Sequence, residues 1–176
     1  MKKIRKITKF KGLVGENDEL LNEYKSSLQE FDEKNNCTKE VEFTTEGEIE
    51  TASGYKFDEK NNLIEEIHYF EGGDVGEVVK YKLNDEGKPV EITTNYADGS
   101  LSVKKASRFE NMVSVKSFDE DEELEGEDLV KYNGDGKIIE EIRYDEDKSI
   151  VNHSLYTYNA DQKIQSKRAG CYFLSF

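Results

Sequence analysis

Carboxylates are the commonest reactive groups in this 176-residue chain, which has 39 Asp and Glu. One segment is especially dense in them. It holds Asp119, Glu120, Asp121, Glu122, Glu123, Glu125, Glu127 and Asp128. Runs of oxygen ligands can bind calcium, but the EF-hand order with its central glycine is absent. The run is therefore interpreted first as a solvated hairpin loop, and second as an electrostatic contact for a basic partner.

Two pairs of neighbouring glutamates, Glu65-Glu66 and Glu140-Glu141, are the obvious candidates for acid–base chemistry. A glycosidase needs two carboxyl groups that face one cleft at a set separation. Neighbours on a β-strand point to opposite faces, so each pair is expected to split across the sheet. The pairs also recur at equivalent places in a repeat, which favours a structural, solvent-facing role.

Metal, thiol and nucleophile chemistry has little support in the sequence. The two histidines, His68 and His153, stand far apart, with no HExxH or CxxC motif, and are interpreted as strand residues on the polar face. Cys37 and Cys171 are also far apart and are interpreted as reduced structural thiols, with Cys37 a small core residue. No Gly-x-Ser-x-Gly motif or phosphate-binding loop is present. The sequence therefore predicts no enzyme, no cofactor and no metal.

A repeat positions these residues. Its lead residue recurs every 26 residues, with one step of 23 before Tyr132. The lead residues are Phe31, Phe57, Leu83, Phe109, Tyr132 and Tyr158. A turn follows each, and Asn or Gly stands at the slot that favours positive φ. That slot holds Asn35, Asn61, Gly87 and Gly136, and in the short repeat Glu110-Asn111 could close the turn tightly.

A second turn follows later in each unit. It is marked by Glu46-Gly47, Gly72-Gly73 and Asp98-Gly99, which are strong hairpin signals. Glu122 and Lys148 stand there in the later units, so the signal fades toward the C-terminus. Pro89 and an opposite alternation in the third unit predict a bulge or a register change.

Between the turns, apolar and polar residues alternate as they do in strands. Tyr55 and Phe57 are expected to share one face, and so are Ile67 and Tyr69. Two strands per unit predict about twelve strands in all, more than a flat open sheet usually holds. The predicted fold is all-β: an antiparallel β-meander of about six 26-residue hairpin repeats that forms a curled open sheet or half-barrel, with its aromatic face inward. A flat single layer is the alternative.

The chain is predicted to be a single β-repeat domain over residues 1–176. Residues 1–30 would form an irregular N-terminal cap, 31–170 the repeats, and 171–176 a terminal strand. Residues 17–30 are ambiguous between a helix and a strand with a bulge. Strand is favoured because Phe31 is already in repeat register. The apolar residues that could line a helix there are Leu20, Leu21, Tyr24, Leu28 and Phe31.

The formal net charge of −14 constrains the partners. A nucleic-acid binder needs a basic surface to replace counterions, and an anionic membrane repels an acidic chain. Both are therefore excluded as partners, whereas a basic protein would be attracted. The charge could also serve only to keep an exposed sheet soluble. No segment resembles a signal peptide and no apolar run is long enough to span a membrane, so the predicted location is cytoplasmic.

Three segments carry a family resemblance: Tyr55–Leu63, Val130–Ile138 and Tyr156–Ile164. They resemble the YD or RHS-type repeat, whose core is roughly Tyr-x-Tyr-Asp-x-x-Gly-x-Leu, although the Asp here is often Asn or Glu. The resemblance implies a long curling β-sheet that encapsulates or binds. Small β-hairpin repeat proteins of related style, including MORN-like ones, act as antitoxin or immunity proteins.

The expected function is a non-enzymatic protein-binding repeat protein. Its most concrete form is an acidic immunity protein that neutralises a basic toxin through the Asp119–Asp128 run. The alternative is a structural or carbohydrate-binding surface repeat protein, with Tyr81, Tyr96 and Tyr172 as exposed rings. Outer strands offer edges for self-pairing, so the sequence leaves the oligomeric state open.

Overall fold

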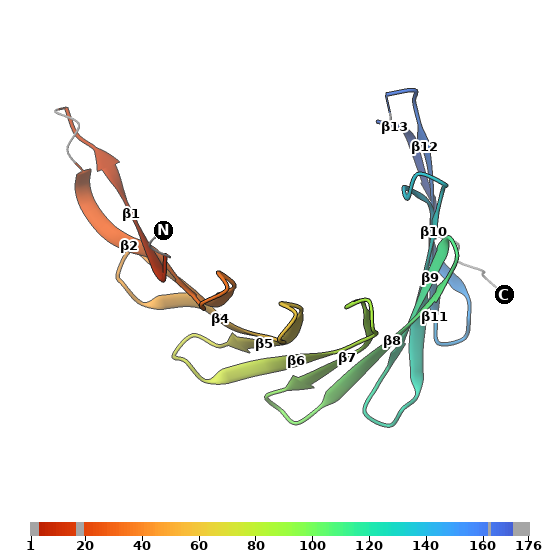
Figure 1. Ribbon diagram of the computed structural model, residues 1–176, viewed down its shortest axis with the longest axis horizontal. Coiled ribbons are helices and arrows are strands. Elements are labelled where there is room, and N and C mark those ends of the chain that lie inside the picture. Colours follow the sequence, from red (N-terminus) through yellow and green to blue (C-terminus); the bar gives the residue numbers. More distant parts are fainter. Residues whose placement is uncertain (1–3, 17–19, 162, 171–176) are drawn as a thin grey trace. The chain divides into compact units, whose positions relative to one another are not determined.

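The computed structural model describes residues 4–16, 20–161 and 163–170, and these contain thirteen strands and no helix (Figure 1). The strands are β1 (Lys6–Val14), β2 (Leu20–Phe31), β3 (Cys37–Phe43), β4 (Ile49–Phe57), β5 (Leu63–Tyr69), β6 (Val75–Leu83), β7 (Pro89–Tyr96), β8 (Leu101–Phe109), β9 (Met112–Phe118), β10 (Leu124–Tyr132), β11 (Ile138–Asp145), β12 (Ile150–Tyr158) and β13 (Ile164–Gly170).

The hydrogen-bonded order of the sheet is the order of the sequence, from β1 at one end to β13 at the other. This confirms the predicted open antiparallel β-meander. By its internal contacts the chain divides into two compact units. The first comprises Met1–Lys82 and Thr94–Ser100, and the second Leu83–Thr93 and Leu101–Phe176.

Nine of the described hairpin turns share one geometry. In the turn that begins at Asp58, the Asp58 N–H donates to the Asn62 carbonyl at 2.9 Å, and the Asn61 N–H donates to the Asp58 carbonyl at 3.1 Å. The fourth residue, Asn61, has a φ of 68°. This is a three-residue hairpin loop, a turn followed by a left-handed residue that forms a bulge. The same two backbone bonds occur in the turns that begin at Asp32, Thr44, Phe70, Asn84, Tyr96, Asp119, Asn133 and Asp145.

The sequence predicts positive φ at the fourth turn position only where Asn or Gly stands there. Asn35, Asn61, Gly87 and Gly136 have positive φ, as predicted for the first turn of each unit. Where the glycine signal fades, Glu122 and Lys148 still adopt φ of 63° and 61°. In the short repeat Phe109 pairs with Met112, so Glu110-Asn111 closes the hairpin tightly, as predicted.

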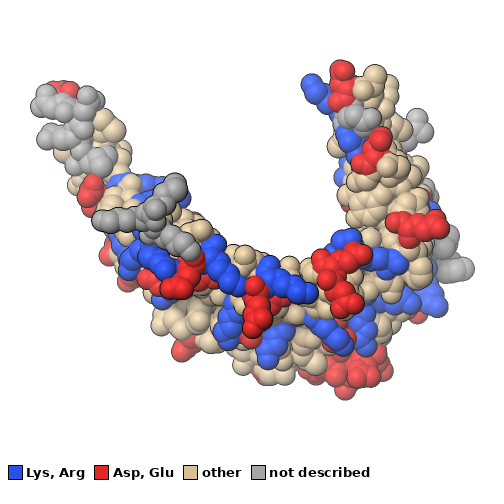
Figure 2. Space-filling model, viewed as in Figure 1, with Lys and Arg blue, Asp and Glu red and all other residues tan. Residues whose placement is uncertain are grey.

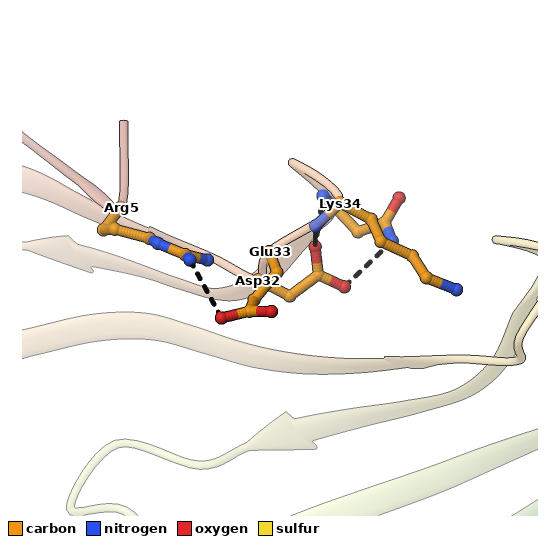
Figure 3. A network of polar contacts seen from close by, with 5 residues as sticks. Arg5, Asp32, Glu33 and Lys34 are labelled. Carbon is orange, nitrogen blue, oxygen red and sulfur yellow. Dashed lines mark hydrogen bonds and ion pairs between the residues drawn. The ribbon is translucent and has the colours of Figure 1, made fainter. Parts of the chain in front are cut away.

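The first turn residue is usually an acceptor that caps the turn. Asp32 Oδ1 accepts the N–H groups of Lys34 and Asn36 at 2.8 and 2.9 Å, while the neighbouring Glu33 pairs with Arg5 (Figure 3). Asx side chains suit this role because they bond to backbone N–H groups just ahead of them. Equivalent caps come from Thr44, Asp58, Asn84, Asp119, Asn133, Asp145 and Asn159.

The bulged turn sets which side chains share a face. Ala52 stands opposite Tyr69, whereas Tyr55 stands opposite Glu66. Since opposite residues share a face, Tyr55 and Tyr69 lie on different faces. The prediction of one aromatic face is therefore wrong. The extra residue in the bulge, where the register shifts between Lys56 and Phe57, inverts the alternation inferred across the turn.

The core is small. Leu28, Val41 and Ala52 are the buried hydrophobic residues of its one cluster in the described chain, and Phe43, Ile49 and Tyr69 pack against them. Leu28 faces Val41, which in turn faces Ala52, so the cluster runs across three neighbouring strands. Apolar burial is the main driving force for folding, so here it must act together with many local turns and ladder bonds.

The ambiguous N-terminal segment is a strand with irregularities. β2 pairs with β1, with register shifts between Lys9 and Phe10 and between Lys11 and Leu13. The favoured interpretation of residues 17–30 is thus confirmed for residues 20–30. Pro89 is the first residue of β7, a strand position that proline tolerates. The predicted terminal strand 171–176, which includes Cys171 and Tyr172, lies outside the described residues.

The two strained turn residues provide a stability test. Replacing Glu122 or Lys148 with Gly should raise the free energy of unfolding by about 0.5–1 kcal/mol, because glycine holds positive φ without a Cβ clash. Urea denaturation followed by circular dichroism measures the change. Gly47→Ala is the control: a Cβ there meets nothing within 4 Å but keeps a φ of +87°, so this change should destabilise. Lower stability of K148G would contradict the strain.

The turn caps predict how stability depends on pH. A hydrogen bond from the Asn62 side chain is the main cause that lowers the pKa of Asp58. The ionised cap therefore stabilises the fold above the unfolded pKa of about 3.9, and this contribution is lost as the pH falls through the folded pKa. Asn84 and Asn133 make the same backbone bonds without titrating.

Asp58→Asn should therefore lower stability at pH 7, since Asn62 loses its acceptor, but should flatten the loss below about pH 4. Asn133→Asp is the reverse change and should steepen it. Urea midpoints at several pH values measure both effects. Parallel pH profiles for the parent and both variants would refute the capping account.

Candidate protein-binding surface

Three of the eight carboxylates predicted as a partner site have internal roles. Asp119 caps the β9–β10 turn by accepting the N–H groups of Asp121 and Glu123 at 3.0 and 2.8 Å. Glu127 accepts a hydrogen bond from the Ser114 hydroxyl. Asp128 pairs with Arg143, with 2.7 Å between Oδ1 and Nε.

The other five carboxylates form what we call the acidic turn: Glu120, Asp121, Glu122, Glu123 and Glu125. All five residues are exposed, and in the described part of the chain none of their side chains has a hydrogen-bond or ion-pair partner. Figure 2 shows the resulting acidic patch, at the bottom of the view. The structure thus narrows the predicted site from eight carboxylates to these five.

The equivalent turn three repeats earlier, which begins at Thr44, is less acidic. There Glu46, Glu48 and Glu50 occupy the places of Asp121, Glu123 and Glu125. The places of Glu120 and Glu122 are held by Thr45 and Gly47. Since both turns have the same backbone bonds, the fold does not require the additional charge.

The glutamate pairs split across the sheet as predicted. Glu65 stands opposite Lys56, and its Oε1 lies 2.6 Å from the lysine Nζ. On the other face, Glu66 accepts a hydrogen bond from the Tyr81 hydroxyl at 2.8 Å, and its Oε2 lies 3.3 Å from His68 Nε2.

The repeat that begins at Tyr132 has a similar arrangement. Glu140 pairs with Lys131 at 2.6 Å and contacts His153 Nε2 at 2.8 Å, while Glu141 accepts from the Tyr156 hydroxyl. The hydrogen bond from Lys131 is the main cause that lowers the pKa of Glu140. Each carboxylate is thus a cross-strand tie, and neither pair has the geometry of two carboxyls that face one cleft.

Neither histidine lies on a purely polar face. His68 stands opposite Ser53, whose hydroxyl lies 3.0 Å from His68 Nδ1, and opposite Glu77 on the next strand. The same face also carries Tyr55 and Val79, which stand opposite Glu66, so the prediction of a polar face is not confirmed for His68. His153 stands opposite Ile142, so the prediction is wrong for His153. The bulge at the turn, which inverts the alternation, explains this error. The polar contact of His153 is with the Glu140 carboxylate.

Cys37 is a half-buried free thiol at the start of β3, and burial is the main cause that raises its pKa. Across residues 4–16, 20–161 and 163–170, no group of three or more His, Cys, Asp or Glu is arranged to hold a metal ion. In the same residues there is no helix with the length and apolar character needed to cross a membrane.

Sequence reasoning missed the side chains with which Glu127 and Asp128 are already paired. Those partners, Ser114 and Arg143, lie on the strands next to β10, so only the strand register identifies them. Comparison of the chain with protein-family models and with curated proteins gave no match.

The Tyr81–Glu66 contact predicts an unusual titration. Burial, followed by the hydrogen bond to Glu66, raises the pKa of Tyr81 to about 12. Any stability from this contact is therefore present below the unfolded pKa of about 10 and is lost as the pH rises through the folded value. Burial also raises the pKa of Tyr55, so absorbance at 295 nm should show a late-titrating component that Tyr81→Phe reduces by one tyrosine. Glu66→Gln should lower the pKa of Tyr81 only in part, because burial remains. Ionisation of Tyr81 near pH 10 in the folded protein would contradict the contact.

Proposed function

We propose that this chain is a non-enzymatic protein-binding repeat protein whose acidic turn contacts a basic protein. The observation that carries the proposal is the group of five exposed, unpaired carboxylates at the β9–β10 turn. Unpaired charges of one sign at one place attract an oppositely charged surface and speed its capture.

The overall charge supports the same partner chemistry. At a net charge of −14, the field around the chain repels nucleic acid and anionic lipid and favours a basic protein. Exposed ion pairs are individually weak, at about 0–1 kcal/mol each. The acidic turn would therefore contribute mainly to the association rate and its salt dependence, and apolar contacts elsewhere would hold the complex.

The specific role proposed is that of a cytoplasmic immunity protein. A toxin domain that binds nucleic acid must itself be basic, so it has the required charge. Binding over its active site would block it without any chemistry by this chain. The resemblance of Tyr55–Leu63 to the YD or RHS-type repeat supports this role only as an analogy of fold.

A carbohydrate-binding role has less support from the tyrosines expected to form it. The Tyr81 side chain is half-buried and its hydroxyl bonds to Glu66. Tyr172 lies outside the described residues. Tyr96 is exposed and is available for binding.

Co-purification from the native cell at low and at high salt tests the proposal. The informative variant is D121N/E123Q/E125Q, and the matched control is E46Q/E48Q/E50Q, which removes the same charge from the same turn positions of an earlier repeat. We expect a stoichiometric basic protein that is released by salt. Its association rate, measured by surface plasmon resonance, should fall several-fold in the first variant and little in the control.

Two results would count against the proposal. Recovery of the chain alone at low salt would remove its basis in partner binding. A partner whose association rate is independent of salt, or falls equally in both triple variants, would show that the acidic turn is not the contact.

A further inference from the structure

A cleft of about 600 Å³ opens beside the β5–β6 and β7–β8 turns, within the first of the two compact units. The two turns are tied together by a hydrogen bond of 2.8 Å from the Ala97 N–H to the Gly76 carbonyl. Volumes of this size are typical of ligand sites. The lining residues are His68, Tyr69, Phe70, Gly76, Glu77, Tyr96, Ala97, Asp98 and Ser100.

Two aromatic rings stand in this cleft where the fold favours a polar cap. Phe70 and Tyr96 are the first residues of their turns, the position that Asp, Asn or Thr occupies in the other turns of this geometry. A phenylalanine ring has no acceptor, and the tyrosine hydroxyl stands at the far end of its ring, too far from the N–H groups of its own turn to cap them. Both rings are instead exposed, Phe70 at 55% and Tyr96 at 42%. Both turns thus display a ring at the capping position, and in the Tyr96 turn Asp98 Oδ1 accepts the Ser100 N–H at 2.9 Å in place of a side chain at position 96.

Gly76 provides the space for one of these rings. A Cβ at this position would lie 3.0–3.2 Å from three carbon atoms of the Phe70 ring, which is too close for unstrained packing. Equivalent places in other units carry side chains, including Glu50, Ser102 and Val151. The absence of a side chain at Gly76 therefore lets Phe70 lie against the strand beside the cleft.

The polar lining of the cleft is acidic. Glu77 and Asp98 each contribute a carboxylate, and none of the described residues that line the cleft is Lys or Arg. The Ser100 side chain donates to Asp98 at 2.7 Å, and this bond is the main cause that lowers the pKa of Asp98. His68 has partners of its own: Nδ1 lies near the Ser53 hydroxyl, and Nε2 lies 3.3 Å from Glu66 and 3.8 Å from Glu77.

Aromatic faces next to carboxylates are the surroundings that a guanidinium group prefers. Its planar cation stacks on rings and also donates paired hydrogen bonds to carboxylates. We infer that this cleft binds an arginine side chain of a basic protein segment. The inference deepens the proposed function and rests on it for the nature of the partner, but its site is separate in sequence from the acidic turn.

Titration of the full chain with the peptide acetyl-Gly-Arg-Gly-amide, followed by ¹H–¹⁵N NMR, tests the inference. The backbone amides of Phe70, Gly76, Glu77, Ala97 and Ser100 should shift together and saturate. The same peptide with citrulline, a neutral isostere of arginine, should bind at least about tenfold more weakly, because it keeps the shape but loses the charge.

Two variants and one control locate the binding. Tyr96→Leu should weaken the arginine peptide about fivefold by removing a ring face, and Glu77→Gln should weaken it by a similar factor. Phe10→Leu is the matched control, because Phe10 is a comparably exposed aromatic of the same unit, at 54%, outside the cleft. It should leave the affinity unchanged.

Three results would overturn the inference. They are equal binding of the citrulline peptide, unchanged affinity in both Y96L and E77Q, and shifts of the cleft amides by a neutral oligosaccharide such as cellohexaose but not by the arginine peptide. If a basic partner still co-purifies and is released by salt, any of these results leaves the proposed function standing. Loss of that partner with retained peptide binding would remove the proposed function but not the cleft.

Discussion

The left-handed residue at the fourth position of the turns is the constraint on which the rest of the structure depends. It closes the hairpin, adds one residue to one strand, and so decides which side chains share a face with those of the next strand. Asn61 satisfies it with a tolerant side chain, whereas Glu122 and Lys148 satisfy it against their own preference. The backbone hydrogen bonds of the turn therefore outweigh the conformational cost of positive φ at Glu122 and Lys148.

Much of the fold can be predicted from the sequence, because spacing and turn chemistry are local properties. The repeat of 26 residues and the Asn or Gly slots predict the number of hairpins and their antiparallel order. The faces could not be predicted, because a bulge of one residue inverts the alternation without changing the spacing. Tyr55 and Tyr69 are the clear case. A hairpin without a bulge would put both on one face of the sheet, but the observed register puts them on opposite faces.

The acidic segment illustrates a similar limit. Composition identifies Asp119–Asp128 as carboxylate-rich, yet it cannot distinguish a capping or paired carboxylate from a free one. Asp119 serves its own turn and Asp128 serves Arg143, so only the solvent-facing members are left for a partner. Conversely, nothing in the composition of the chain singles out Phe70 and Tyr96 among its nine Phe and ten Tyr. They become informative only when the turn geometry shows that a cap belongs at their positions.

The sequential strand order has a kinetic consequence. Every ladder that joins neighbouring strands closes a short stretch of chain, so the fold has a low contact order for an all-β protein. Its loop-closure entropy is accordingly small, and folding can begin at any hairpin and extend to the next. A strand that emerges early during synthesis finds its partner within the next few residues, and it need not wait for the distant half of the chain.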